Sequence, residues 1–518
     1  MFAWAWKHVL LTCDAMAREA EMRSSASADR EIVVGLVTPL GCPADETEIA
    51  FKDAFEAHGY LSETLRISDL LDKEVPSDAV QPATSRRELL MNKGNLFRQR
   101  YDSDGACALM AAQHISMKRE EETRAPDRHR PRFVTIVRSL KTPGEVHVLR
   151  QIYGPRMIVV GVSASRKIRR GELIKELRAQ PLSRSEASSQ ADLLIARDER
   201  DDAPRYGQRT RDAYQLADAF VVAKSGAGKS TVERFVRLLL GDPFETPTLD
   251  EQGMFSAWGA RFRSSAAGRQ VGAAIVDEFG EVVALGCNDV PKPGGGQYWK
   301  GEKCDLRDFK LGYDANDRGK HGAASSLLTA LRDAGWLAAD RSHVSADSLA
   351  DQALEDGGPL DASEFSGLIE YGRIVHAEMS ALMTAARSGR AVLGCTLYTT
   401  TYPCHECARL IIAAGIRRVC FVDAYPKSRA SELYREVWTQ KRARGVVLVE
   451  QFEGVSPRVF SRLFEASNRE KNVDGTYQDW TCKQLVVPDE ELADSVPLNE
   501  EAAAWELKER GLKATDSK

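Results

Sequence analysis

The residues from about 31 to 242 alternate between short apolar runs and longer amphipathic segments. The apolar runs are β-prone and read EIVVGLV, RFVTIVRSL, RMIVVGVSA, DLLIA and DAFVVA. Segments with helical periodicity lie between or beside them, at TEIAFKDAFEAHG, GEVHVLRQIYG, RKIRRGELIKELRAQ and STVERFVRLLL. Short continuous apolar strands that alternate with helices indicate a parallel sheet with helices on both faces. The pattern therefore predicts an α/β domain over residues 31–242.

A second domain begins near residue 250, after the linker GDPFETPTLDEQ. It opens with a helix at MFSAWGARFRSSAA and a hairpin at VGAAIVDEFGEVVALGCN, whose turn carries Gly280. A polar insertion at about 300–370 shows no evident catalytic constellation. The chain then continues as helix, strand, helix and strand, at VHAEMSALMTAARSG, TLYTTT, CHECARLIIAAG and RRVCFVDAY. We predict that this domain spans 250–487, with an N-terminal extension at 1–30 and a C-terminal tail at 488–518.

Composition narrows the class of protein. The chain of 518 residues is 43% hydrophobic and 28% charged, as in ordinary globular proteins, and its formal net charge of -5 argues against a broad basic surface for nucleic acid. Ten cysteines are scattered along the chain, which favours reduced thiols in a cytoplasmic protein. The apolar stretch MFAWAWKHVLLTCDA is too short to span a bilayer and lacks a basic n-region, so we expect no membrane segment.

The strongest chemical signal is HAE at 376–378 followed by PCHEC at 403–407. A catalytic zinc ion takes three nitrogen or thiolate ligands and leaves its fourth position to water. His376, Cys404 and Cys407 supply such a set, and the two cysteines fall at the start of a helix, where thiolates are favoured. The pattern predicts a bound Zn²⁺ ion and is the general signature of zinc-dependent base deaminases.

Glu378 is the candidate general acid and base. Two residues apart in a regular helix point about 200° away from each other, so Glu378 and His376 can face one metal only if the helix begins between them. Glu378 would take a proton from water and deliver it to the ring nitrogen and to the leaving ammonia. The alternative is a closed structural zinc site with Cys395 as fourth ligand, but we expect Cys395 to pack as a small apolar side chain.

Several stretches together resemble the bacterial two-domain anti-phage dCTP deaminases, in the deoxycytidylate deaminase branch of the zinc-dependent cytidine deaminase superfamily. They are HAEMSAL, TLYTTTYPCHECARLIIAAGIRRV, RSSAAGRQVGAAIVDEFGEVVALGCNDVPKPGGGQYW and FEGVSPRVFSRLFEASNREKNVDGTYQDW, with the kinase-like first half. The resemblance implies an N-terminal P-loop kinase-like domain and a C-terminal α/β/α deaminase domain. It also implies deamination of a deoxycytidine nucleotide, depletion of dCTP during phage infection, a homo-oligomer and, in some relatives, an inhibitory small RNA.

The same resemblance suggests which residues hold the nucleotide. Asn288 falls where these enzymes hold the sugar, and Arg269, Lys292 and Lys427 fall in segments that resemble the nucleotide-contacting ones. Tyr425 is expected to border the base or the sugar. For each cation the alternative is a solvated charge, and for Tyr425 it is an aromatic side chain packed in the core.

The first half contains two candidate phosphate loops. One is TPLGCPADE after the first strand, where the family's phosphate loop belongs and where Gly35 and Gly41 remain. Pro, Ala and Asp at 43–45 replace the expected Gly, Lys and Ser, so we expect a degenerate loop without its phosphate-binding lysine.

The other candidate, AKSGAGKS at 223–230, has suitable residues but an unsuitable place. Only one helix follows it before the linker, which leaves no room for the strands that a phosphate-loop sheet needs afterwards. We interpret it mainly as the start of a helix with incidental Lys229 and Ser230. A nucleotide contact at the carboxyl edge of the sheet is the alternative.

The function that follows is zinc-dependent deamination of free dCTP or dCMP in antiviral defence. One alternative is a housekeeping dCMP deaminase, and a less favoured one is a deaminase of bases in RNA or DNA, which needs a basic or aromatic path for the strand. A further hypothesis is that the first domain senses a nucleotide, an RNA or a phage product and gates the deaminase.

Overall fold

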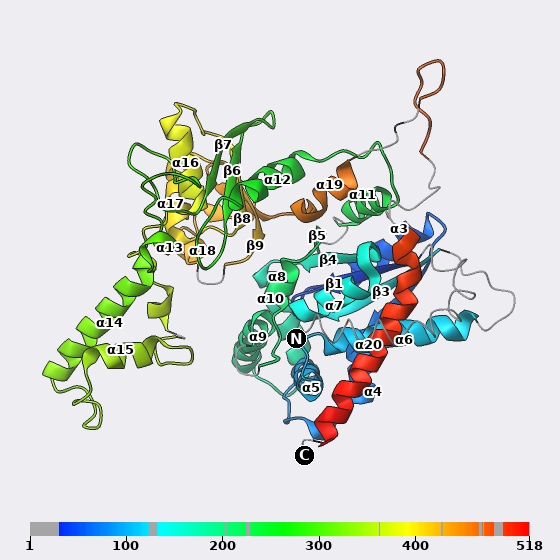
Figure 1. Ribbon diagram of the computed structural model, residues 1–518, viewed down its shortest axis with the longest axis horizontal. Coiled ribbons are helices and arrows are strands. Elements are labelled where there is room, and N and C mark those ends of the chain that lie inside the picture. The colour runs from blue at the N-terminus through cyan, green and yellow to red at the C-terminus, as the bar shows by residue number, and fades with distance from the viewer. Residues whose placement is uncertain are drawn as a thin grey trace. The chain divides into compact units, whose positions relative to one another are not determined.

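The structure is a computed structural model, and it divides into two compact units. It describes residues 31–123, 132–201, 205–223, 228–361, 363–425, 428–465, 469, 471–480 and 490–516. Unit 1 comprises residues up to Pro247 together with those from Glu453 onward, and unit 2 comprises Thr248–Phe452 (Figure 1). The residues from 453 onward therefore group with unit 1, whereas the sequence predicts that the second domain continues to 487.

Unit 1 is built around a six-stranded sheet in the order β12-β5-β4-β1-β3-β2. All neighbouring pairs are parallel except β12 with β5. The strands are β1 (Glu31–Val37), β2 (Leu61–Arg66), β3 (Phe133–Leu140), β4 (Met157–Ser163), β5 (Ala219–Val222) and β12 (Gly454–Val455). The continuous apolar runs that predicted β1, β3, β4 and β5 are buried, and the α/β class predicted for the chain is confirmed.

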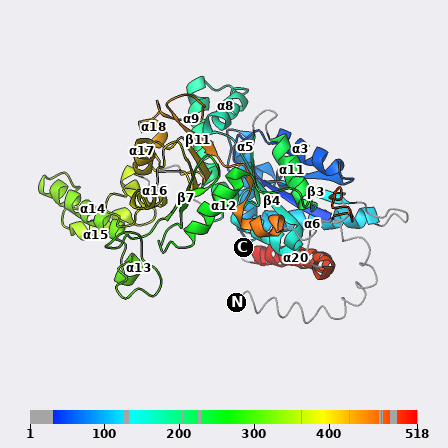
Figure 2. The same cartoon turned by 90° about the horizontal axis from the view of Figure 1, so that it is seen from above.

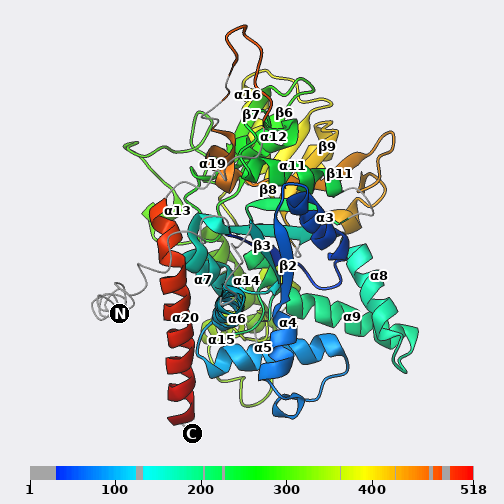
Figure 3. The same cartoon turned by 90° about the vertical axis from the view of Figure 1, so that its right-hand side faces the viewer.

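Helices cover both faces of this sheet (Figures 1 and 3). Helix α3 packs on α11, whereas α6 contacts α7 on the other side and the long α20 lies along both of them. The helices of unit 1 are α3 (Asp45–Glu56), α4 (Ile67–Glu74), α5 (Arg86–Arg100), α6 (Ala106–Thr123), α7 (Pro143–Tyr153), α8 (Arg166–Leu177), α9 (Arg184–Glu199), α10 (Thr210–Tyr214), α11 (Lys229–Leu239), α19 (Phe460–Phe464) and α20 (Glu490–Asp516), with short 3₁₀ turns η2 (Ser77–Ala79), η3 (Gly154–Arg156) and η5 (Pro457–Val459).

One predicted strand of unit 1 is wrong. The run DLLIA at 192–196 lies inside helix α9. Ser183 and Glu186 form a capping box that starts this helix, and the buried Ala187, Leu194 and Ile195 form its inward face. A short apolar run cannot by itself distinguish a strand from a buried segment of a helix, and here the cap determines the outcome.

Unit 2 contains a mixed six-stranded sheet in the order β10-β11-β9-β8-β6-β7. The strands from β10 to β8 are parallel, and β6 runs antiparallel to both β8 and β7. The strands are β6 (Gly272–Val276), β7 (Val282–Cys287), β8 (Thr396–Thr401), β9 (Arg418–Asp423), β10 (Trp438–Thr439) and β11 (Val447–Gln451). The predicted hairpin is confirmed, with Gly280 at a φ of 91° in its turn.

Two helices approach the sheet of unit 2 closely from opposite faces. Gly272 lets α12 (Leu249–Arg261) approach, since a Cβ atom there would lie 2.0 Å from the carbonyl oxygen of Ala257. Gly286 does the same for α16 (Ala377–Arg387), where a Cβ atom would lie 2.2 Å from the carbonyl oxygen of Ala377. Larger residues at either glycine would push the helix off the sheet. Since α16 carries the HAE motif, Gly286 helps to fix its position.

The insertion of unit 2 is helical. It contains α13 (Asp308–Leu311), α14 (Ala315–Asp333), α15 (Ala346–Leu354) and the 3₁₀ turn η4 (Glu364–Gly367), and α14 and α15 lie side by side (Figure 2). Helices α17 (His405–Ala413) and α18 (Ala430–Leu433) complete the unit. Among the helices that the structure describes, none has the length and apolar composition needed to cross a membrane.

Candidate functional site

The first part of the site is the start of helix α16. His376 is the residue before its first turn and has extended backbone angles, with φ of -66° and ψ of 156°. Val375, just before it, exchanges two backbone hydrogen bonds with Asp289, which fixes the direction from which the chain enters the helix. Glu378 is then the second residue of the helix proper. The predicted start of the helix between His376 and Glu378 is confirmed, and both side chains face the same site.

The second part is the start of helix α17. Strand β8 ends at Thr401, and Cys404 caps the helix, its Sγ accepting a hydrogen bond of 3.4 Å from the backbone N–H of Cys407. The unpaired N–H groups at a helix N-terminus carry partial positive charge, which favours a thiolate there. Cys404 and Cys407 are both buried.

The two helix starts bring three metal-binding groups together. The Nδ1 atom of His376 lies 3.2 Å from Sγ of Cys404 and 3.4 Å from Sγ of Cys407. All three donor atoms lie within 4.8 Å of one another. A tetrahedral zinc ion with ordinary bond lengths places a nitrogen and a sulfur ligand about 3.6 Å apart. The spacing and the chemistry of these donors therefore fit zinc.

The hydrogen bonds among these three side chains shift their pKa values in different directions. The hydrogen bond from Cys407, with another from His376, lowers the pKa of the Cys404 thiol well below its ordinary value. The pKa of Cys407 is raised, first by the same hydrogen bond to Cys404 and then by burial. The hydrogen bond to Cys404 also raises the pKa of His376. The group thus already stabilises one thiolate, the form of cysteine that binds metals.

Glu378 lies beside the three donors without being one of them. Its Oε2 atom accepts a hydrogen bond of 3.4 Å from Sγ of Cys407, and the residue is only 4% exposed. Burial raises the pKa of its carboxyl group. A buried carboxyl group beside such donors is placed to accept a proton and to return it.

Cys395 does not join the group. It is 5% exposed and packs in the apolar core of unit 2 beneath the sheet, as predicted. Within the described residues the metal-binding group consists of His376, Cys404 and Cys407 alone, so it has three protein ligands. Three ligands leave one tetrahedral position for water, which is the arrangement of catalytic rather than structural zinc.

A cavity of about 430 Å³ opens at this group. Residues around the metal-binding donors form its base, and the segments 266–271 and 369–374 with Thr401, Tyr402 and Tyr425 form its walls. The insertion contributes Asp308, Asp314 and Asn316. The sequence reasoning found no chemistry in the insertion, because its polar residues are spread over helices whose packing the pattern does not reveal.

Arg373 is a cation of this cavity that the sequence reasoning missed. It lies three residues before His376, in GRIVHAE, and its Nη1 atom donates a hydrogen bond of 2.9 Å to Asp308. Its Nη2 atom donates to the carbonyl oxygen of Leu306 at 3.0 Å. The signal available in the sequence was its proximity to the zinc motif.

The residues predicted to hold a nucleotide divide into two groups. Arg269, Asn288 and Tyr425 all line the cavity. Arg269 forms an ion pair with the buried Asp423. The side-chain amide of Asn288 accepts from the N–H of Val271 and donates to the carbonyl oxygen of Arg269, both at 2.7 Å, so it holds this wall of the cavity in shape.

Lys292 is not among the residues that line this cavity. It lines a separate one with Trp299 and Arg387, and its Nζ atom pairs with Glu302 at 2.6 Å. The expectation that Lys292 contacts the same nucleotide as Arg269 therefore lacks geometric support. Lys427 lies outside the described residues.

The residues of the two phosphate-loop candidates lie in unit 1. Gly35 is inside β1, and Gly41 has a left-handed φ of 77° in the segment that follows. Lys229 and Ser230 begin α11, and the exposed ammonium group of Lys229 lies 3.7 Å from Asp53 and 3.9 Å from Glu233. Residues 224–227 are outside the described residues.

Comparison with known proteins places unit 2 in context. Residues 248–423 match the family described as the cytidine and deoxycytidylate deaminase zinc-binding region. The chain is 43% identical over 60 residues to human deoxycytidylate deaminase, covering 11% of this chain and 33% of that protein. It is 38% identical over 55 residues to the deoxycytidylate deaminase of Enterobacteria phage T2, covering 11% of this chain and 29% of that protein. The matched segments thus span a third or less of these relatives.

Among solved structures, the dCMP deaminase of cyanophage S-TIM5 in complex with dCMP and dUMP matches with a TM-score of 0.23 and 19% identity. That match covers 40% of this chain and 99% of the cyanophage protein. The family match includes His376, Glu378, Cys404 and Cys407, whose side chains the structure brings together. Residues 248–423 are thus similar to the cytidine and deoxycytidylate deaminase zinc-binding region.

Proposed function

We propose that unit 2 is a zinc-dependent deaminase of free deoxycytidine nucleotides. The observation that carries this proposal is the placement of a buried carboxyl group, Glu378, against a His, Cys, Cys group at the base of a 430 Å³ cavity. Zinc held by His376, Cys404 and Cys407 would supply an activated water molecule as the nucleophile. The names of the curated relatives, deoxycytidylate deaminases, support a deoxycytidine nucleotide as the substrate.

Glu378 moves the protons of the reaction. Hydrolysis forms a bond from the water oxygen to C4 of cytosine and breaks the bond from C4 to the amino nitrogen, which leaves as ammonia. One proton goes from the water to the ring nitrogen N3, and a second goes to the leaving amino group. Glu378 accepts and returns each of them, which its buried position and raised pKa favour.

Two arginines suit the phosphate group of the substrate. Arg269 and Arg373 line the same cavity and come from different segments of unit 2. Arg269 pairs with Asp423, and Arg373 donates to Asp308 and to the carbonyl oxygen of Leu306, while a guanidinium group has five N–H donors in all. Charge-assisted hydrogen bonds from such donors are the usual means of binding phosphate. These cations support a nucleotide over a nucleoside.

A free nucleotide is favoured over a base within RNA or DNA. The net charge of -5 offers no broad basic surface for a strand. The resemblance to anti-phage enzymes favours dCTP and a role in depleting it during infection, whereas the names of the curated relatives favour dCMP and nucleotide metabolism. We retain both phosphate states within the proposal.

Product analysis separates these substrates. Purified full-length protein is given dCMP, dCTP, CTP and a cytosine-containing single-stranded oligonucleotide in separate reactions, and the products are resolved by chromatography. We expect conversion of dCMP or dCTP to the deoxyuridine nucleotide, and of neither CTP nor the oligonucleotide. Uracil in the oligonucleotide, with the free nucleotides unchanged, would contradict the proposal.

A further inference from the structure

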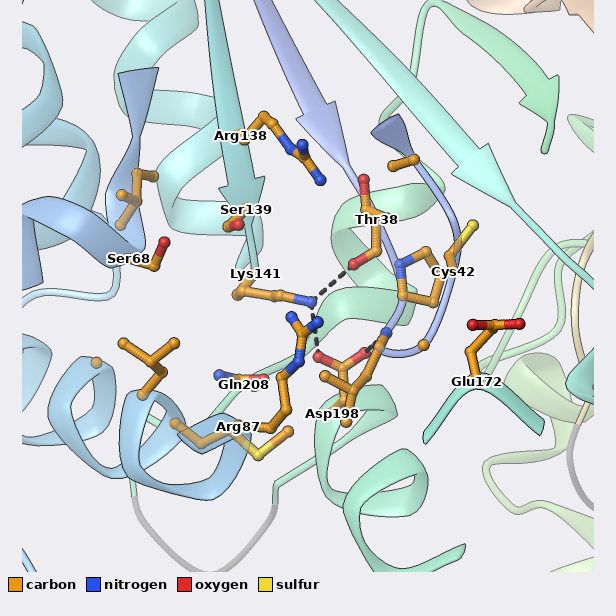
Figure 4. Close-up of a pocket in the computed structure, with 18 of the residues that line it drawn as sticks. Thr38, Cys42, Ser68, Arg87, Arg138, Ser139, Lys141, Glu172, Asp198 and Gln208 are labelled. Atoms are coloured by element: carbon orange, nitrogen blue, oxygen red, sulfur yellow. Dashed lines mark hydrogen bonds and ion pairs between the residues drawn. The ribbon is translucent and has the colours of Figure 1, made fainter. Parts of the chain in front are cut away.

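Unit 1 contains a cavity of its own, with a volume of about 550 Å³, at the carboxyl edge of its parallel strands. The segment after β1, the end of β3 and helices α4, α5 and α8 surround it (Figure 4). Small-molecule sites usually occupy about 300–1,000 Å³. The cavity is thus large enough for a metabolite and lies wholly within unit 1.

The strand order explains why the cavity opens at this place. Strands β1 and β3 are neighbours, but β1 connects onward to β2 beyond β3, whereas β3 connects onward to β4 on the other side of β1. The two connections leave the carboxyl edge in opposite directions and therefore separate. Such switch points are where open parallel sheets bind ligands.

Cationic side chains converge on this space. Arg138 and Lys141 come from the end of β3 and the residue just after it, while Arg87 comes from α5 (Figure 4). Lys175 of α8 also lines the cavity, and within the described part of the chain no ion pair to it is found. Four cations from three segments can surround one anionic group.

Acidic residues also line the cavity, but they do not prevent an anion from binding there. Asp198 is fully buried and is used by the protein itself, as described below. The Asp45 side chain is 80% exposed where it pairs with Arg138, and that of Glu176 is 44% exposed where it pairs with Arg87. Glu172 lies at the exposed surface of α8. Exposed ion pairs are weak, so a phosphate group can compete for Arg87. Arg138 also pairs at 2.6 Å with Glu48, whose side chain is 8% exposed, so a phosphate group would use the other N–H donors of this guanidinium group.

Buried polar atoms without hydrogen-bond partners, together with an apolar wall, suit a ligand that has both polar and apolar groups. Gln208 is only 5% exposed, yet its Oε1 atom has no hydrogen-bond partner in the part of the protein that the structure describes, and the same holds for Oγ1 of Thr38. Both residues line the cavity. Buried polar atoms are nearly always hydrogen-bonded, so these two suit the polar groups of a bound molecule. Leu71, Leu90 and Met91 supply an apolar wall nearby.

We propose that this cavity binds a nucleoside monophosphate. Arg87, Arg138 and Lys175 bind the phosphate group, and Leu71, Leu90 and Met91 pack against the base. Gln208 and Thr38 hydrogen-bond the polar edge of the base or the sugar hydroxyls. This site is separate from the deaminase cavity, and its ligand need not contain a cytosine base.

We expect binding here without phosphoryl transfer, because Ala44 and Asp45 stand where a phosphate loop has its Lys and Ser. In the segment after β1, the N–H of Leu40 donates to Oδ2 of the buried Asp198 at 2.7 Å and that of Cys42 donates to the carbonyl oxygen of Pro39, so these two amide groups are not available to a ligand. Lys141, the cation closest to this segment, is held by Asp198 at 2.8 Å and by the carbonyl oxygen of Thr38 at 2.7 Å. The carboxylate of Asp198 thus engages this lysine within the protein itself.

Calorimetric titration of the full-length protein tests this site. AMP and GMP are the probes, because neither carries the cytosine or uracil ring that the deaminase cavity takes. We expect at least one of them to bind, and adenosine or guanosine without phosphate to bind at least about tenfold more weakly. Replacement of Arg87 and Lys175 together by Gln is expected to weaken nucleotide binding about tenfold or more.

Two further variants make the result unambiguous. Arg86→Gln is the matched control, because Arg86 is on the same helix, pairs with Asp72 at the surface and does not line the cavity; its affinity should stay within about twofold of wild type. Lys175→Gln alone changes an exposed residue, so a loss of affinity in this variant cannot be assigned to misfolding. The absence of AMP and GMP binding up to about 1 mM, binding of inorganic phosphate alone, or equal affinity in the wild type and the double variant would each overturn the proposal.

Discussion

The two units differ in what the polar groups at a strand-to-helix turn contact. In unit 2 the turns before α16 and α17 direct His376, Cys404 and Cys407 toward one another, and the donor atoms have the spacing that a metal ion needs. In unit 1 the turn between β1 and α3 is closed by Asp198, which takes the N–H of Leu40 and the ammonium group of Lys141. The same kind of turn thus brings metal-binding groups together in unit 2, whereas in unit 1 an internal carboxylate satisfies two of its polar groups.

Among the changes that test this comparison, we expect Glu378→Gln to have the largest effect, which is on the turnover number of unit 2. The amide keeps the size of the side chain but cannot carry protons, so the turnover number should fall by about 10²–10⁴-fold. Zinc content, measured by atomic emission, should stay at the wild-type value because Glu378 is not one of the three donors. Activity within a few-fold of wild type would remove Glu378 from proton transfer.

Replacing Asp198 by Ala tests the closed turn of unit 1. It leaves Lys141 and the N–H of Leu40 without their buried partner, so we expect a loss of about 3–5 kcal/mol in the free energy of unfolding of this unit. Hydrogen exchange of the amide groups in β1 and the following turn is the measurement. Asp192→Ala is the control, since Asp192 is on the same helix and pairs with Arg170 at the surface, where the expected loss is below about 1 kcal/mol. Equal losses in the two variants would show that Asp198 does not hold the turn.

Replacing Arg373 tests whether this cavity cation binds the phosphate group of the substrate. In Arg373→Gln the Michaelis constant for dCMP should rise about tenfold while the turnover number stays within a few-fold, because the proposal gives this cavity arginine a role in binding phosphate and none at the reacting ring. Steady-state kinetics measure both constants. Arg435→Gln serves as the control, because its side chain is 80% exposed and is not part of the cavity lining. An unchanged Michaelis constant for both dCMP and dCTP would exclude Arg373 from phosphate binding.

The smallest expected effect concerns acid stability of unit 1. Burial opposes ionisation of Glu48, but hydrogen bonds from Thr64, Lys52 and Arg138 outweigh it and lower the pKa of Glu48 from 4.5 to about 2. A carboxyl group with a depressed pKa contributes stability that is complete above pH 4.5 and is lost as the pH falls toward 2. Thermal unfolding of wild type and Glu48→Gln should therefore differ by about 1 kcal/mol at pH 7 and converge near pH 2. A difference that does not change with pH would contradict this assignment.

The chemistry of unit 2 was largely predictable because it resides in short sequence motifs. His376, Cys404 and Cys407 come from two helix starts whose residue types and spacing specify them locally. The cavity wall supplied by the insertion was not predictable, because Asp308 and Arg373 meet only through tertiary packing. The same reason explains Lys292, whose sequence context resembles a phosphate-binding segment but whose side chain lines a different cavity.

In unit 1 most of the fold could be predicted, but the residue that closes the turn after β1 could not. Strands β1, β3, β4 and β5 were predictable from their apolar runs, whereas the parallel strand β2, which reads LSETLR, has no such run and was not predicted. Pro43, Ala44 and Asp45 after β1 replace the residues expected in a phosphate loop. The carboxylate that closes this turn lies 158 residues further along the chain, so no local pattern could reveal it. The run DLLIA was assigned to a strand because four apolar residues after an aspartate carry too little periodicity to indicate a helix.

The most direct test of the central claim is a reaction of the wild-type protein with dCMP and dCTP in water enriched in oxygen-18, followed by mass spectrometry of the nucleotides. We predict a deoxyuridine nucleotide that carries one oxygen-18 atom at C4, released together with ammonia, and no such product from Glu378→Gln under the same conditions. Recovery of unchanged dCMP and dCTP from zinc-loaded wild-type protein would contradict the claim that unit 2 deaminates free deoxycytidine nucleotides.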